Sequence, residues 1–250
     1  MGSKRSNIKR YGLIGRNIAY SFSRGYFKQK FETENLENCT YENFDLNEIE
    51  ELNKILTKKN IYGLNVTTPF KREVVPFLDR LSPIAEKMNA VNTIKLHEDG
   101  SISGHNTDVY GFEKSLLEII NNPPKKALIL GTGGASSAVA FVMKKLNIEF
   151  SYISRSAGAN AIKYNKVDEK VIYEHHLIIN ASPLGTFPDI KLAPKLPYSF
   201  LTNDHVLFDL IYNPPETRFL QEGKKRGCKI LNGQKMLEYQ AEKSWEIWNQ

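Results

Sequence analysis

Cysteine is scarce in this 250-residue sequence, and long apolar runs are missing from it. The two cysteines, Cys39 and Cys228, form no CxxC pattern, so we expect no disulfide framework and a reducing, cytoplasmic environment. No apolar stretch reaches the roughly 20 residues that span a bilayer, and no signal-peptide core follows the basic start. The sequence therefore predicts neither a membrane protein nor a secreted, disulfide-stapled one.

Blocks of like charge are also missing. Lys and Arg number 34 against 28 Asp and Glu, a net charge of +6, and the basic residues are spread along the chain. A basic balance favours anionic partners, but a dispersed one is not typical of nucleic-acid binding. The five histidines show no metal-ligand spacing, because the adjacent His175 and His176 would face opposite sides of a strand. We expect a small-molecule substrate, no metal, no membrane and no nucleic acid; a monomer and a homodimer are both left open.

The first six residues fit the pattern for N-myristoylation, with basic residues beside it. Because short motifs match by chance, we interpret this segment as a leader ahead of the first strand. A lipid anchor is therefore not expected.

Alternating strands and helices on both sides of a proline-rich break predict an α/β protein of two domains. Before the break we expect strands at Tyr11–Ile14, Tyr41–Leu46 and Gly63–Val66, helices at 24–35 and after an Asn47 cap, and a hairpin joining 90–97 to 101–105. A helix from Asp108 ends at the break, Asn121 to Pro124. After it we expect strands at Lys126–Leu130, Ile148–Ile153, Leu177–Asn180 and Val206–Leu210, and helices at Ala135–Leu146 and Gln234–Trp248.

A glycine turn directly follows the strand at Lys126–Leu130 and opens the next helix. Gly131 permits the tight turn, Gly133 lets the backbone approach a pyrophosphate, and small Ser136 allows close helix–strand packing. The helix N-terminus then offers free N–H groups and a partial positive charge to the phosphates. A glycine triplet alone is a weak signal, but between a strand and a helix it favours a dinucleotide site over a merely structural turn.

The end of the next strand distinguishes the two nicotinamide cofactors. An NAD site usually places an acidic residue there for the ribose 2′-hydroxyl. This chain has Ser154-Arg155-Ser156 instead, with no acidic residue as far as Ala161. Because a guanidinium suits a 2′-phosphate, we expect NADP (NADPH) as the cofactor.

We therefore expect two α/β domains, one over 1–107 and a Rossmann-like dinucleotide-binding domain over 123–230. A connecting helix covers 108–122. The C-terminal helix lies within 231–250.

Four polar clusters follow strands or lie in loops of the first half: Ser21-Phe22-Ser23, Asn65–Lys71, Ala90–Thr93 and Gly104–Asp108. Each alone also suits capping or turn chemistry. Together and in this order they resemble the shikimate dehydrogenase family. Downstream, Asn180-Ala181-Ser182, Asp209–Tyr212 and the G-x-x-M-L-x-x-Q pattern from Gly233 to Gln240 extend the resemblance over nearly the whole chain.

The resemblance implies that residues 1–107 form the substrate-binding domain and that the C-terminal helix packs back on it. It also implies roles for individual residues. The family's N-V-T-x-P-F-K segment implies Lys71 as the catalytic lysine, and its N-T-D segment implies Asp108 as the catalytic aspartate. Substrate contacts are implied at Ser21, Ser23, Thr67, Asn92, Tyr212 and Gln240. The candidate cofactor-binding residues, from the glycine turn, the following strand end and the resemblance, are Gly131, Gly133, Gly134, Ala135, Ser154, Arg155, Ser156, Asn180, Ser182, Leu210 and Gly233.

The sequence departs from the family pattern in four places. Asn89 replaces a glycine before Ala90, and Thr186 stands where methionine is usual. In the first loop, Asn17, Tyr20 and Arg24 stand where proline and histidine are usual. The stretch from Ser156 to Asn180 is short, so we expect the cofactor domain to lack part of a helix there.

The implied activity is the reversible NADPH-dependent reduction of 3-dehydroshikimate to shikimate, a step in chorismate and aromatic amino acid biosynthesis. Reducing a ketone needs a hydride from the nicotinamide and a proton for the oxygen, which an ammonium such as that of Lys71 can donate. A quinate or dual quinate/shikimate dehydrogenase using NAD is the alternative within the family, and Arg155 argues against it. A non-catalytic ligand sensor is the alternative outside it, and retention of both Lys71 and Asp108 argues against that.

Overall fold

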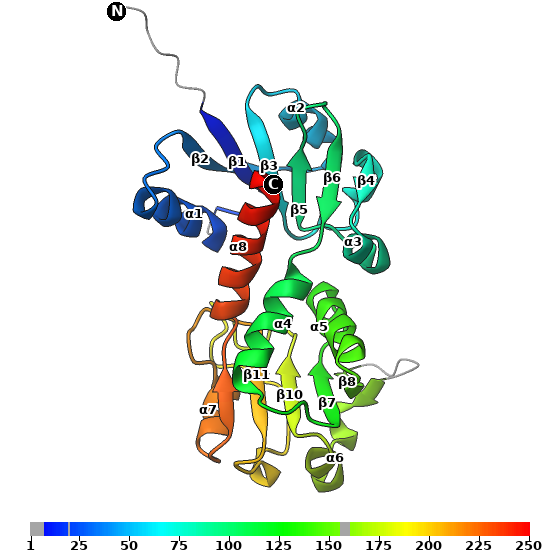
Figure 1. Cartoon of the computed structure of the whole chain (residues 1–250). Coiled ribbons are helices and arrows are strands. Elements are labelled where there is room, and N and C mark those ends of the chain that lie inside the picture. Colours follow the sequence, from blue (N-terminus) through cyan, green and yellow to red (C-terminus); the bar gives the residue numbers. More distant parts are fainter. Residues whose placement is uncertain (1–7, 20, 156–160) are drawn as a thin grey trace, which may run out of the picture. The chain divides into compact units, whose positions relative to one another are not determined.

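The computed structural model describes residues 8–19, 21–155 and 161–250, and the chain divides into two compact units (Figure 1). Unit 1 comprises the residues up to Thr107 together with Ala241–Gln250, and unit 2 comprises Asp108–Gln240. The myristoylation pattern, Tyr20 and Ser156 lie outside the described residues. Among the described residues, no helix has the length and apolar character needed to cross a membrane.

Unit 1 is built on a mixed six-stranded sheet in the order β2-β1-β3-β5-β6-β4. Its strands are β1 (Lys9–Gly15), β2 (Cys39–Asp45), β3 (Ile61–Val66), β4 (Arg80–Leu81), β5 (Thr93–Leu96) and β6 (Ile102–His105). Strand β1 runs parallel to β2 and β3, whereas β5 runs antiparallel to β3 and β6. The β5–β6 pairing confirms the predicted hairpin.

Helices cover both faces of this sheet. One face packs against α1 (Phe22–Thr33) and α8 (Gln234–Asn249), through an aromatic core in which Tyr11 stacks on Trp248 at 4.9 Å. A Cβ on Gly63 of β3 would lie 2.2 Å from the Trp248 indole, so only glycine lets the ring lie there. An aliphatic core on the other face packs under these elements: η1 (Ile49–Glu51), α2 (Leu52–Leu56), η2 (Val75–Phe77) and α3 (Pro83–Met88).

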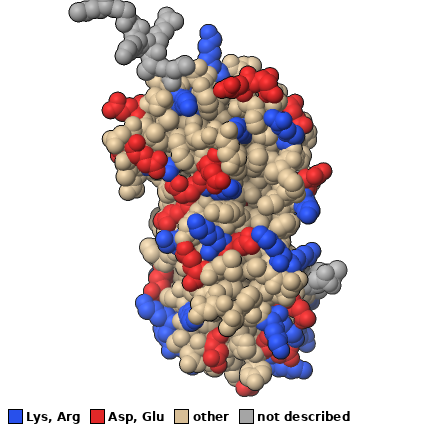
Figure 2. All heavy atoms as spheres, in the orientation of Figure 1, with Lys and Arg blue, Asp and Glu red and all other residues tan. Residues whose placement is uncertain are grey.

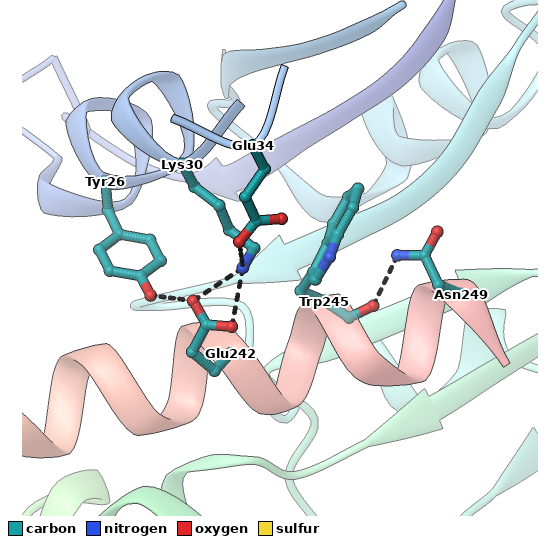
Figure 3. Close-up of polar contacts among 6 residues, drawn as sticks. All are labelled: Tyr26, Lys30, Glu34, Glu242, Trp245 and Asn249. Atoms are coloured by element: carbon teal, nitrogen blue, oxygen red, sulfur yellow. Dashed lines mark hydrogen bonds and ion pairs between the residues drawn. The ribbon is translucent and has the colours of Figure 1, made fainter. Parts of the chain in front are cut away.

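A buried lysine ties α1 to α8 (Figure 3). The Lys30 side chain is only 9% exposed and donates hydrogen bonds to Glu34 at 2.6 Å and Glu242 at 2.9 Å. The Tyr26 hydroxyl donates to the same Glu242 carboxylate. Burial opposes the charge, but the hydrogen bonds to Glu34 and Glu242 outweigh it and raise the pKa of Lys30. The ammonium therefore stays charged and holds the two helices together.

Unit 2 is a wholly parallel six-stranded sheet in the order β12-β11-β10-β7-β8-β9. Its strands are β7 (Lys126–Leu130), β8 (Glu149–Ser154), β9 (Ala161–Lys163), β10 (Leu177–Asn180), β11 (Val206–Asp209) and β12 (Lys229–Leu231). Strand order reverses between β7 and β10, and such a switch point opens a ligand crevice at the carboxyl ends of the strands. The two α/β units confirm the predicted fold class.

Both faces of the unit 2 sheet are covered. Helices α4 (Asp108–Ile119) and α5 (Gly134–Lys145) lie on one face, where Phe112 stacks on Phe208 at 5.1 Å. The other face carries η3 (Tyr164–Lys166), α6 (Glu169–Glu174), η4 (Tyr198–Phe200) and α7 (Arg218–Lys224). On the surface drawn in Figure 2, basic and acidic side chains are interspersed.

One local prediction is corrected by the structure, and another is extended. Asn47 does not cap the helix that follows it; Glu48 does, in a capping box with Glu51, and a short 3-10 turn precedes α2. The segment between β8 and β10 contains β9, η3 and the six-residue helix α6, so the expected shortened helix is present with an added edge strand.

Candidate functional site

The predicted substrate residues of unit 1 lie at one edge of its sheet. Strands β1, β3 and β6 end at this edge, and antiparallel β5 begins there. Ser21 follows β1, Thr67 and Lys71 follow β3, Asn92 precedes β5, and Thr107 follows β6. Residues from four separate stretches of chain are therefore gathered by strand direction alone.

The two serines lie at the start of α1. We expected Ser21 and Ser23 on an extended loop, which is wrong for Ser23, because it lies in the first helical turn. Ser21 is the N-cap, and its hydroxyl accepts a hydrogen bond from the Ser23 N–H at 3.2 Å. Two half-buried hydroxyls at the positive end of a helix suit a carboxylate.

Lys71 lies in a turn after β3 and not at the start of a helix. The Thr67 N–H donates to the Ile14 carbonyl at 2.8 Å, and Phe70, fully buried, fixes the turn from below. The Lys71 carbonyl accepts the Val91 N–H at 2.7 Å. The backbone around this half-buried lysine is thus held at both ends.

Asn92 clamps the chain that leads to Asp108. Its side chain is 3% exposed; Oδ1 accepts the Thr107 N–H at 2.7 Å and Nδ2 donates to the Thr107 hydroxyl at 2.9 Å. Asp108 comes next and is the first residue of α4, where the helix dipole favours a carboxylate. Asn92 therefore positions the backbone next to the candidate catalytic aspartate.

Ser244 on α8 joins this buried network, and sequence reasoning missed it. Its hydroxyl lies 2.8 Å from that of Thr93 and 3.2 Å from that of Thr107, and it accepts from Asn65 Nδ2 at 3.0 Å. The Tyr41 hydroxyl donates to the Asn65 oxygen at 2.8 Å. The available signal was a serine four residues after Gln240, on the same face of an amphipathic helix. Because all these groups are buried, the bonds fix the edge more firmly than exposed ones would.

The beginning of α4 lies close to α8. A Cβ on Gly111 would lie 2.5 Å from the Met236 carbonyl oxygen and 3.0 Å from Gln240 Cβ, so glycine is needed for this approach. Gln240 is 8% exposed. Gln240 therefore lies against α4 at Gly111, about one helical turn from Asp108.

Tyr212 and Leu210 lie on the segment that follows β11. Tyr212 is half-buried, and burial raises the pKa of its hydroxyl. A Cβ on Gly233 would lie 2.1 Å from the Leu210 carbonyl oxygen, and the Gly233 N–H donates to the Ile211 carbonyl at 3.0 Å. Gly233 thus packs directly against the segment that carries the tyrosine.

The glycine turn adopts the predicted form. Gly131 has φ +107°, a conformation that favours glycine, and a Cβ there would lie 3.1 Å from the Ala181 carbonyl oxygen. Gly133 is the N-cap of α5, with Gly134 and Ala135 in the first turn. The helix N-terminus is therefore open to a phosphate.

A cavity of about 330 Å³ lies at the carboxyl ends of β7, β8 and β10. It brings together five predicted cofactor residues: Gly131, Gly133, Ser154, Arg155 and Ser182. The remaining lining is Thr132, Ile153, Tyr164, Ala181, Pro183 and Leu184. Gly134, Ala135, Asn180, Leu210 and Gly233 are not part of this lining. The exposed Arg155 guanidinium, beside the glycine turn and the N-terminus of α5, fits a phosphorylated dinucleotide.

Asn180 does not line the cavity but supports it through a buried hydrogen-bond network centred on Asp209. The sequence analysis did not single out this network. Its Oδ1 accepts from the Ser182 hydroxyl at 2.7 Å, and its Nδ2 donates to Asp209 at 3.0 Å. The Asp209 carboxylate also accepts from the Thr217 hydroxyl at 2.5 Å and the Ile211 N–H at 3.0 Å. Complete burial raises the pKa of Asp209 to about 6, against the lowering effect of these three hydrogen bonds. This hydrogen-bond network holds the carboxyl ends of β10 and β11 together.

A doubly wound sheet with this cavity at its switch point, in a chain with a second α/β unit rich in polar edge residues, defines a two-domain dinucleotide-dependent oxidoreductase. Residues 13–94 match the family described as the shikimate dehydrogenase substrate binding domain. A shikimate dehydrogenase (NADP(+)) of Pelagibacter ubique is 38% identical, over 96% of this chain and 93% of the relative. The chain belongs to the shikimate dehydrogenase family.

Solved structures agree with this assignment. The shikimate 5-dehydrogenase of Thermus thermophilus, in complex with NADP(H) and shikimate, has a TM-score of 0.82 at 31% identity and covers 96% of this chain and 93% of its own. The quinate dehydrogenase of Corynebacterium glutamicum, in complex with NAD, has a TM-score of 0.88 at 25% identity and the same two coverages, 96% and 93%.

Proposed function

We propose that this chain catalyses the reversible reduction of 3-dehydroshikimate to shikimate with NADPH. The observation that carries the proposal is the set of residues held at one edge of the unit 1 sheet: Lys71 in its fixed turn, and the clamp from Asn92 to Thr107 next to Asp108. The names and bound ligands of the relatives support it.

Lys71 and Asp108 carry the proton chemistry. When bound, the nicotinamide supplies a hydride to the carbonyl carbon. The Lys71 ammonium stabilises the negative charge that develops on the oxygen and donates the proton that completes the hydroxyl. The Asp108 carboxylate is proposed to orient the ammonium and to share the proton that it donates. In the reverse direction the same pair takes the hydroxyl proton.

The remaining residues at this edge of the sheet are proposed to bind the carboxylate and ring hydroxyls of the substrate. Ser21, Ser23 and the N-terminus of α1 receive the substrate carboxylate, and Thr67 and Asn92 hydrogen-bond the ring hydroxyls. Tyr212 and Gln240 are proposed as further substrate contacts, as the family resemblance implies. A site built to pair hydroxyls discriminates strongly against analogues that lack them, because its buried polar groups are then left unpaired.

In unit 2, Arg155 is proposed to pair with the 2′-phosphate of the cofactor. Arg155 lines the cavity and is exposed, and no hydrogen bond or ion pair to another described residue engages its guanidinium. The glycine turn and the N-terminus of α5 would hold the pyrophosphate.

The direct test is the absorbance of reduced nicotinamide with purified protein and four combinations of substrate and cofactor: shikimate or quinate, with NADP or NAD. We expect shikimate with NADP to give the highest kcat/KM. A preference for quinate with NAD would instead support the second candidate, to which the structural likeness to the quinate dehydrogenase points. Inactivity in all four would contradict the proposal.

A further inference from the structure

The chain after β8 places a tyrosine next to the arginine that faces the cofactor cavity. Strand β9 pairs in parallel with β8 in a register that sets Ser154 opposite Lys163. Arg155 directly follows β8, and Tyr164 directly follows β9. Since neighbouring strands lie roughly 4.8 Å apart and parallel strands end at the same edge, these two residues leave the sheet side by side.

The Tyr164 side chain belongs to the cavity and to the core at once. It lines the cavity of about 330 Å³ together with Gly131, Ser154 and Arg155. The ring is half-buried and packs against the apolar cluster under α6 and α7, which fixes its position. Burial raises the pKa of its hydroxyl, against the opposing charge of Arg155, so the phenol stays protonated and remains a hydrogen-bond donor at neutral pH.

This hydroxyl makes no hydrogen bond to any residue within the described parts of the chain. Among the described residues that line the cavity, no basic side chain besides Arg155 is present to provide a second donor to the anion expected there. The next one along the sequence is Lys163, which does not line the cavity.

We propose that Tyr164 is a specificity-determining residue for the phosphorylated adenosine end of the cofactor, donating its hydroxyl hydrogen bond to the 2′-phosphate that Arg155 pairs with. This inference rests on the proposed cofactor site.

The test compares two fragments by calorimetric titration of the full-length protein: adenosine 2′,5′-bisphosphate, which carries the 2′-phosphate, and adenosine 5′-monophosphate, which does not. Tyr164→Phe keeps the packed ring and removes only the hydroxyl. We expect it to weaken binding of the bisphosphate by about tenfold, as loss of a hydrogen bond to a charged group implies, and to leave the monophosphate unchanged. Tyr173→Phe, at a tyrosine of α6 that is 75% exposed, is the matched control.

Two results would overturn the role of Tyr164: unchanged binding of both fragments, or an equal loss for both in a protein whose circular dichroism is unaltered. Failure of the proposed cofactor site itself looks different. In that case the unaltered protein would bind neither fragment, or would bind both equally well, and Arg155→Gln would have no effect on either.

Discussion

Ser21 and Ser23 have different structural duties although both are proposed to bind the same carboxylate. Ser21 caps α1, so Ser21→Ala should cost about 1 kcal/mol of stability besides weakening substrate binding. Ser23→Ala leaves the cap intact. We therefore expect Ser23→Ala to raise KM for shikimate while KM for NADP and the melting temperature stay close to those of the unaltered protein. Steady-state kinetics with thermal denaturation measures all three; an equal rise of both KM values would place the carboxylate elsewhere.

Arg155 is the residue predicted to decide between the two cofactors. Arg155→Asp removes a charge-assisted contact and adds repulsion, worth about 1.5–3 kcal/mol. The NADP/NAD ratio of kcat/KM should therefore fall at least roughly tenfold. Arg226→Asp makes the same charge change at an exposed position of the turn after α7 and should leave the ratio unaltered. An unchanged ratio in the Arg155 variant would remove this residue from the site.

At the scale of elements, strand ends hold the cofactor cavity in shape, and Asp209 provides a pH-dependent test. Its pKa of about 6 in the folded chain exceeds the usual value of about 3.9 for an unfolded one. The folded state therefore binds the proton more tightly, so this group's contribution to stability is fully present below about pH 4 and is lost as pH rises through 6.

Asp209→Asn should remove that dependence, because an amide can keep hydrogen bonds with Asn180, Thr217 and Ile211 without titrating. Relative to this variant, the unaltered protein should gain up to about 3 kcal/mol between pH 7 and pH 4, measured by urea unfolding at each pH. Asp209→Ala leaves the buried donors of Asn180, Thr217 and Ile211 without this acceptor, so this variant should be strongly destabilised at both pH values. Parallel stability curves for Asp209→Asn and the unaltered protein would show that the carboxyl group does not titrate in this range.

The sequence predicted the elements whose signal is local. Strands β7 and β10 were predicted at their observed bounds, because a parallel strand covered on both faces reads as an unbroken apolar run. Strands β9 and β12 have three residues each and depend on pairing with their neighbours, so no periodicity marks them. The motifs likewise pointed to Asn92 and Lys71 as candidate site residues. They did not point to Ser244, because its place in the buried network follows from packing between elements far apart in the sequence.

At the scale of the whole molecule, the proposed site residues are distributed over both compact units. Lys71 belongs to unit 1, whereas Asp108 opens unit 2, which also contains the cofactor cavity. The sequence supplies the identity of these residues, since each lies in a recognisable motif. It does not supply the clamp from Asn92 that fixes the chain ahead of Asp108, because that contact joins residues 15 positions apart through side-chain atoms.

The central claim is that Lys71 and Asp108 act as one proton-transfer unit on the bound substrate. The most direct measurement is kcat for Lys71→Met, Asp108→Asn and the double variant, with shikimate affinity from a direct binding titration and folding checked by circular dichroism. Each single variant should lower kcat by roughly 10²–10⁴-fold with substrate affinity nearly intact, and the double variant should be less than additive. Near-normal turnover of folded Lys71→Met, or losses that simply multiply in the double variant, would contradict the claim.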